Sequence, residues 1–203
     1  MTVERWLDQE VIERDLDELD LVEAELRGCR FERCRFRDAR LTEAKITNCV
    51  FDQCDFRGAH LGSAIFIDSA LVTCEFGMTD FFLTTFRECK LTGSTFTEID
   101  LSQTTIAGGD WSLVNLRACN LHGLDLRKVR FAEADLFSAN LRDADLREAD
   151  LTSANLDRAR LAGADLRGAR LDGLNLPALD LRGVHLDLEQ AVYLARCHGA
   201  LVE

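Results

Sequence analysis

Large apolar side chains recur at every fifth position along almost the whole chain. From Leu16 to Leu186 the series has 35 members, all of them Leu, Ile, Phe or Trp, and it never changes register. Trp6 and Val11 extend the series towards the N-terminus. A second column lies two residues earlier and holds mostly small side chains, while the positions between the columns are mostly polar. The pattern is an internal repeat of five residues.

A period of five fits neither the roughly 3.6 residues of a helical turn nor the two residues of a flat strand. It fits a chain that turns a corner every five residues, so that the large residue and the small one before it both point inward. Four such sides close one coil in about 20 residues, and successive coils stack about 4.8 Å apart, like parallel strands. We therefore predict a narrow tube filled by the large column, with Leu116 in the middle of its core.

The motif Ala-(Asp/Asn)-Leu-x-x, as in Ala144-Asp145-Leu146-Arg147-Glu148, resembles that of the pentapeptide-repeat proteins. The resemblance covers nearly the whole chain. It implies the fold of that family, an all-β solenoid wound as a right-handed quadrilateral parallel β-helix. Residues 1–186 are expected to form about nine coils. Each coil is held mainly by its neighbours, so the ends of the stack need caps.

The fivefold period stops at Leu186, and residues 187–203 follow a helical pattern instead. Asp187 is a candidate N-cap and Gly199 a candidate C-cap. The predicted helix carries apolar side chains on more than one side, so two interpretations remain open. It is a lid over the last coil, or it is a lid that also forms a symmetric dimer interface, and the second is favoured. The candidate interface residues are Leu188, Ala191, Val192, Tyr193, Leu194 and Ala195.

The formal net charge of −12 changes the picture of what such a tube can bind. Residues 1–30 hold ten acidic side chains against four basic ones. This balance argues against direct binding to nucleic acid or to an anionic membrane, and it favours a basic protein surface. The chain opens with a polar, acidic segment rather than a signal-peptide pattern, and it has no apolar run of transmembrane length. We expect a cytoplasmic protein.

The cysteines and histidines do not form an obvious reactive site. Seven of the eight cysteines occupy the small inward column, which predicts buried thiols that act as small apolar residues. Cys197, in the terminal helix, is expected to be free. The four histidines are scattered and have no nucleophile or ligand partner at a useful spacing. We therefore expect no catalytic residue, no metal site and no cofactor. The pair Gly108-Gly109 falls inside the repeat and predicts a local distortion near Trp111.

A coil of 20 residues also predicts which charged side chains stack on one another. Asp110, Arg130, Asp150 and Arg170 alternate in sign up one column and should neutralise one another. One face is less balanced and carries an aromatic residue in an outward position. Exposed apolar groups among acids suit a protein contact, although a simply solvated face has about equal weight. The candidate partner-binding residues on this face are Asp80, Phe82, Asp100, Asp143 and Asp180.

The closing segment narrows the resemblance within the family. Asp187-Leu188-Glu189-Gln190-Ala191, followed by Ala195, His198 and Gly199, is similar to the last helix of the mycobacterial fluoroquinolone-resistance proteins, and the chain as a whole more distantly resembles the Qnr proteins. The resemblance implies a dimeric rod that imitates duplex DNA, occupies the basic DNA-binding surface of DNA gyrase, and protects the enzyme from quinolones. The alternatives are a passive scaffold or adaptor and, less favoured, a solenoid enzyme of the acyltransferase type.

Overall fold

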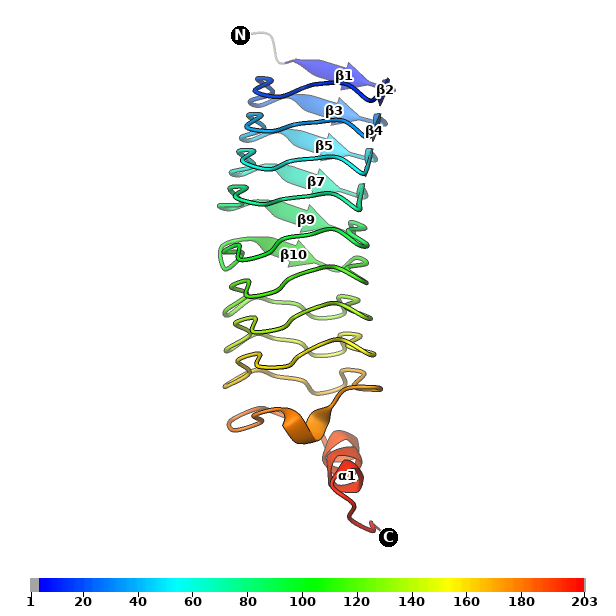
Figure 1. The fold of residues 1–203 in the computed structure, drawn as a ribbon, viewed down its shortest axis with the longest axis vertical. Coiled ribbons are helices and arrows are strands. Elements are labelled where there is room, and N and C mark those ends of the chain that lie inside the picture. Colours follow the sequence, from blue (N-terminus) through cyan, green and yellow to red (C-terminus); the bar gives the residue numbers. More distant parts are fainter. Residues whose placement is uncertain (1–3, 203) are drawn as a thin grey trace.

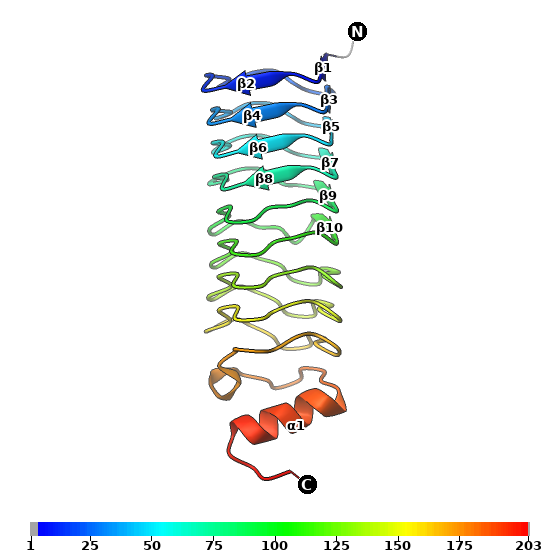
Figure 2. The ribbon, with the colours of Figure 1, turned by 90° about the vertical axis from the view of Figure 1, so that its right-hand side faces the viewer.

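The computed structural model describes residues 4–202 as one straight rod with the two chain ends at opposite tips (Figure 1). Each coil has four sides, and the chain winds through them with a right-handed sense, as the two views together show (Figure 2). The predicted fold is confirmed. We name the four sides in chain order: face A contains Leu26, face B Phe31, face C Phe36 and face D Leu41.

Regular strands occur only on faces A and B among the described residues, and they pair in parallel with the residue 20 positions on, such as Leu26 with Ile46. Faces C and D are joined by single bridges with the same offset, such as Arg35 with Asp55. Face A holds a six-stranded sheet and face B a four-stranded one. The face A strands are β1 (Arg5–Leu7), β3 (Glu25–Arg27), β5 (Lys45–Thr47), β7 (Ile65–Ile67), β9 (Thr85–Arg87) and β10 (Thr105–Ala107), and those of face B are β2 (Glu10–Ile12), β4 (Arg30–Glu32), β6 (Val50–Asp52) and β8 (Ala70–Val72).

The core is a single column of side chains along the axis of the rod. The large residues from Leu21 to Leu176 are buried, and Leu116 is fully buried as predicted. Phenylalanines on successive coils stack face to face, with ring centroids 4.8 Å apart for Phe36 and Phe56. The last coil is less regular, because Pro177 lies in a short 3-10 helix, η1 (Leu176–Ala178), and Leu181 is only partly buried.

Each corner depends on a residue in the left-handed conformation. The second residue after the large one has a positive φ in every pentapeptide from Asp8 to Gly173, with Gln103 as the exception. A positive φ at this position is what a type II turn requires, and most corners close with its hydrogen bond, as from Ala39 N–H to the Phe36 carbonyl oxygen. Corners that follow β3 to β10 lack this bond.

At six of those eight corners a cysteine thiol bonds to the backbone where the turn bond is missing, and Ser69 and Gly109 stand at the other two. Cys, Ser or Gly stands where the other corners carry mostly Ala, and the Cys54 Sγ donates to the carbonyl oxygens of Phe31 and Asp52, each at 3.6 Å. Cys74 repeats the arrangement one coil later. The seven inward cysteines are buried, as the sequence predicts. Their hydrogen bonds to the backbone were not predicted, so they are more than small apolar residues.

The hydrogen-bond ladder is interrupted once in the middle of the rod. On faces C and D, residues 78–83 form no backbone bonds to residues 97–102, and on face A residues 104–108 form none to residues 125–127, in the part of the chain described here. We call these two facing edges the seam. Between these two edges, Leu101 is still bonded to the following coil on face D, and Thr105 is bonded to the preceding coil on face A. The chain therefore passes from one side of the break to the other.

Gly109 accounts for part of the seam. Its φ is +94°, and a Cβ there would lie 2.3 Å from the Cys89 carbonyl oxygen, so the chain approaches the coil above closely. The Thr104 hydroxyl donates to Leu101 within its own turn, whereas the Thr84 hydroxyl donates to Leu61 on the coil above. The distortion predicted at the glycine pair is therefore present.

Helix α1 (Leu188–Cys197) closes the rod. Asp187 is its N-cap, as predicted, and forms a capping box with Gln190. The C-cap is His198 rather than Gly199, which lies one residue further with φ +83°, because a glycine in this conformation normally follows the cap. None of the described helices is long and apolar enough to cross a membrane.

Candidate partner-binding surfaces

The five predicted partner-binding residues all lie exposed on face D, but they form two groups. Asp80, Phe82 and Asp100 sit on the two coils that border the seam. Asp143 and Asp180 lie further towards the C-terminus, with Asp180 five coils, or roughly 24 Å, from Asp80. The structure therefore brings three of the five predicted residues together and places the other two apart from them.

The group at the seam combines exposed apolar side chains with free carboxylates. Phe82 is 58% exposed, and Met78 and Leu83 beside it are 86% and 52% exposed. Asp80 accepts only the Phe82 backbone N–H, and it forms no ion pair with any described residue. Asp100 accepts from Ser102 N–H and from Asn120 Nδ2. We call Met78, Asp80, Phe82, Leu83, Glu98 and Asp100 the seam patch.

Phe137 is an outward aromatic ring that arginine side chains cover. It also occupies an outward position, on face C, but the Arg117 guanidinium lies 4.3 Å above its ring and that of Arg158 lies 5.4 Å away. Phe82 has no such cation among the described residues. Its exposure is therefore a feature of this position and not a general property of outward aromatic rings in the rod.

The two distant aspartates are less available to a partner. Asp180 receives two hydrogen bonds from the Arg182 guanidinium, which lowers the pKa of its carboxyl to about 2. Asp143 lies 3.7 Å from the His122 Nδ1. A carboxylate already paired with a guanidinium attracts a basic partner less, and Asp143 stands apart from the exposed apolar side chains of the seam patch, so both residues are weaker candidates than that patch.

Charge is divided unequally between the two halves of the rod. Residues 1–100 hold 21 acidic and 12 basic side chains, and residues 101–203 hold 15 and 12. Only seven of the 21 acids pair with Arg or Lys, against eight of the 14 described acids of the second half. The predicted column from Asp110 to Arg170 contributes to the difference, as Arg170 pairs with Asp150, and so do pairs two residues apart, such as Arg147 with Asp145. The free negative charge is concentrated before the seam.

The outer side of α1 is the second apolar surface. Gln190 and Leu194 face the rod, and Gln190 Nε2 donates to the carbonyl oxygens of Leu166 and Ala169 on the last coil. Leu188 is 80% exposed and Ala191 is also exposed, so these two candidate interface residues lie on the side of the helix turned away from the rod. The side chains of Leu188, Val192 and Tyr193 line a shallow groove of about 340 Å³ on the outside. The sequence pattern missed Gln190, because a polar residue was not expected to cap the tube.

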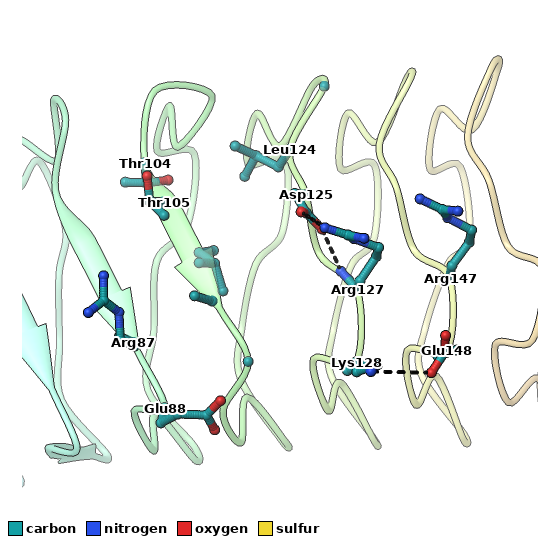
Figure 3. A pocket seen from close by; sticks show the side chains of 14 residues that line it. Arg87, Glu88, Thr104, Thr105, Leu124, Asp125, Arg127, Lys128, Arg147 and Glu148 are labelled. Carbon is teal, nitrogen blue, oxygen red and sulfur yellow. Dashed lines mark hydrogen bonds and ion pairs between the residues drawn. The ribbon is translucent and has the colours of Figure 1, made fainter.

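A hollow of about 740 Å³ lies on face A at the seam (Figure 3). The β10 strand forms one lip and residues 124–128 form the other. Two residues of the second lip are held by ion pairs: Arg127 pairs with Asp125, and Lys128 pairs with Glu148 on the next coil. Sequence reasoning did not find this groove, although Gly108-Gly109 marks its position.

The described residues contain no group of His, Cys, Asp or Glu that could hold a metal ion. Burial raises the pKa of the Cys49, Cys89 and Cys119 thiols to about 11, which keeps them protonated and unreactive. The exposed surfaces can bind through shape, charge and apolar contact.

A tube of stacked pentapeptide coils is the architecture of a repeat protein, in which each coil contacts mainly its neighbours. Family models agree along the chain: pentapeptide repeats (9 copies) match residues 17–76, the pentapeptide repeat region matches residues 79–156, and pentapeptide repeats (8 copies) match residues 149–187. The chain belongs to the pentapeptide-repeat family.

Solved structures of QnrB1, described as a plasmid-mediated fluoroquinolone resistance protein, share the fold. A trypsin-treated variant superposes with a TM-score of 0.85 at 22% identity, over 98% of this chain and 99% of that chain. The full-length protein gives 0.74 at 21% identity, over 97% and 100%. At these identities the likeness concerns the fold. None of the curated proteins matches the chain.

Proposed function

We propose that this protein is a non-catalytic, cytoplasmic, DNA-mimicking rod that binds and inhibits DNA gyrase and protects it from quinolone-type poisons. The observation that carries the proposal is the straight acidic rod with unpaired carboxylates before the seam. Gyrase attracts duplex DNA through basic side chains, and a stiff column of fixed carboxylates competes for them with no base sequence needed. The likeness to the QnrB1 fold and the similarity of residues 187–199 to the last helix of MfpA, a mycobacterial fluoroquinolone-resistance protein, add support.

The contact surface in this proposal is the seam patch. Phe82 and Leu83 supply apolar area at the centre, and Asp80 and Asp100 supply charge around it, which is the usual composition of a protein interface. Asp143 and Asp180 extend the same face as a weaker, outer part of the surface. The patch therefore serves a protein partner with exposed Lys or Arg.

A supercoiling assay with purified gyrase over a series of salt concentrations tests the function. Inhibition that weakens steeply as salt rises is expected, because screening reduces attraction between exposed charges. Cleavage complexes formed with a quinolone should decrease when the protein is added. If the protein has no effect on gyrase at micromolar concentration, the proposal is wrong.

A pair of charge reversals tests the surface separately. Asp80→Lys with Asp100→Lys should weaken inhibition by about tenfold or more without unfolding the rod. The matched control is Asp157→Lys with Asp172→Lys, which changes the net charge equally at exposed positions beyond the seam. Equal losses from the two pairs would point to overall charge alone and would remove the seam patch from the interface.

We also propose that the rod dimerises through the outer side of α1, with Leu188, Ala191, Val192, Tyr193, Leu194 and Ala195 at or beside the interface. The groove lined by Leu188, Val192 and Tyr193 offers apolar surface that a second copy would cover. Leu188→Glu should give monomers in sedimentation velocity, while Leu201→Glu, at a 95% exposed position beyond the helix, serves as the control. A dimer that survives both changes would place the interface elsewhere.

The second candidate function is that of a passive scaffold or adaptor for another protein. The seam patch favours a protein partner in either case, so gyrase inhibition is the discriminating measurement. A protein that leaves gyrase unaffected, and whose seam patch still binds a basic partner, would be a scaffold.

A further inference from the structure

The β10 strand has a free edge in the middle of the rod. It pairs with β9 above through Ile106 and Phe86, and no bridge joins Thr105 to Asp125 below, although bridges resume between Asp125 and Asp145. Strand edges with unpaired peptide groups are templates on which another extended chain can pair. Elsewhere along the described part of face A, each strand or bridge between the two ends of the rod is covered on both sides.

The unpaired peptide groups of β10 alternate along the strand, as they would at the edge of a sheet from which one strand is missing. One coil later, Leu126 N–H donates to Asp145 and Lys128 N–H donates to Arg147. The equivalent donors, Ile106 N–H and Gly108 N–H, have no backbone acceptor in the described chain. These two N–H groups lie on either side of Ala107, whose side chain points outward. They therefore have the spacing at which one extended peptide can accept hydrogen bonds from a strand edge.

The side chains around the edge leave room for such a peptide and indicate its charge. Ala107 has Arg87 as its neighbour on the preceding coil and Arg127 on the following coil (Figure 3). Because the side chain of Ala107 is small, it leaves the face A groove open between the two arginines. Arg87 forms no ion pair with any described residue, whereas Arg127 pairs with Asp125. A carboxylate opposite Ala107 would face Arg87, the guanidinium without an acidic partner, while Asp125 already holds Arg127 and the Glu88 carboxylate lies beside Gly108 at the end of the edge.

We infer that the face A groove is a β-augmentation site for an extended segment of a partner protein that carries an acidic side chain flanked by small residues. The segment adds as a strand to the free edge of β10, and its main chain supplies the hydrogen bonds. Its acidic side chain pairs with Arg87. The site differs in face and in charge preference from the seam patch, and it does not depend on gyrase being the target.

Amide hydrogen exchange of the full-length protein tests the free edge. The amides of Ile106 and Gly108 should exchange at least about a hundredfold faster than those of Leu126 and Lys128, because only the latter are held in the ladder. Equal protection of the two pairs would show that the edge is already covered and would overturn the inference.

Fluorescence anisotropy with a labelled peptide, acetyl-Ser-Ala-Glu-Ala-Ser-amide, tests the ligand. Binding should be at least about tenfold weaker for the peptide with Lys in place of Glu, and for a peptide whose amides are N-methylated. Bound peptide should slow exchange at Ile106 and Gly108. Equal binding of all three peptides, or no binding at millimolar concentration, would overturn the assignment.

Two protein variants separate the site from general charge. Ala107→Glu fills the face A groove with a tethered carboxylate between Arg87 and Arg127, and it should abolish peptide binding. Thr47→Glu places the same charge at the equivalent position of β5, where the ladder is complete. It should leave peptide binding within about twofold of the wild type. Equal losses in both variants would contradict the assigned position.

Discussion

The two halves of the rod follow the same period but are built from different side chains. Before the seam the large column holds nine phenylalanines and the corners of faces A and B hold six of the inward cysteines. After the seam the only phenylalanine of that column is Phe131, and the small column becomes alanine from Ala134 to Ala169. Regular strands end with β10. The comparison shows that the pentapeptide period determines the winding, while the residues within it determine how each corner is closed.

The halves also differ in how they use charge. After the seam, aspartate and arginine two positions apart satisfy one another, as in Asp165 and Arg167. Before it, most acids have no basic partner, although a few pairs such as Arg35 with Asp15 connect coils. The second half is therefore closer to neutral, and the first half keeps most of the negative charge that the proposed function needs.

The largest expected effect concerns the aromatic stack. Phe56→Ala, between stacked rings of Phe36 and Phe76, should lower the free energy of unfolding by about 4 kcal/mol, and Leu116→Ala, beyond the seam, by about 3 kcal/mol. Urea denaturation of both variants measures the difference. Equal losses would mean that stacking adds nothing to burial, and a value near zero at Leu116 would remove that residue from the core.

A substitution at Gly109 tests what causes the seam. Gly109→Ala should destabilise the protein by about 3 kcal/mol, because the left-handed backbone is strained and the new methyl group meets the Cys89 carbonyl. Gly123 has a φ of +69°, nearer the left-handed region that other residues adopt, and open space around it, so Gly123→Ala should cost about 1 kcal/mol. Thermal unfolding compares the two. If both changes have the same effect, close approach at Gly109 does not shape the boundary between the halves.

The cysteine corners offer a smaller test. Cys54→Ala should reduce stability by about 1.5 kcal/mol, since it removes both thiol hydrogen bonds and leaves a small cavity. Cys54→Ser should have less effect, because a hydroxyl can donate to the same carbonyls, as Ser94 does to Leu71. Chemical denaturation under reducing conditions gives the order. A serine variant less stable than the alanine variant would contradict the hydrogen-bonding role.

The smallest effect is a pH dependence in the second half. The Arg167 guanidinium lowers the pKa of Asp165 to about 2, below its value of about 3.9 in an unfolded chain. The stabilisation is therefore complete above pH 5 and is lost as pH falls through 4 towards 2. Asp165→Asn should be about 1 kcal/mol less stable at pH 7, discounted because Arg167 is half exposed, and should equal the wild type near pH 2. A difference that stays constant with pH would exclude this ion pair as its source.

The fold could be predicted almost completely because each inward position depends on one local property, size. The unbroken series of large residues allows one register, and the tube follows from it. The charge ladders were predictable for the same reason, since a fixed coil length stacks Asp150 beside Arg130 and Arg170. Where a structural role depends on only one property at a fixed spacing, the sequence is sufficient.

The seam and the end cap depend on properties that spacing does not reveal. Gln103 looks like any other polar corner residue, yet it alone from Asp8 to Gly173 lacks the left-handed conformation at its position. Phe137 and Phe82 occupy outward positions of the same kind, and only the three-dimensional neighbours decide that arginines cover one of them. The sequence therefore identified the exposed face but not the groove on face A.

The cap at Gln190 has a consequence for how these rods associate. Its amide occupies the carbonyl groups of Leu166 and Ala169, and the Asp187 carboxylate accepts the Gly168 N–H, so the rim of the last coil on face A offers few partners for another strand. An uncapped solenoid end could add a second tube by backbone pairing and grow into a fibre. On face A this end offers little free backbone for such growth, so an end-to-end contact there would rely on side chains of α1, which suit a discrete pair better than an open stack.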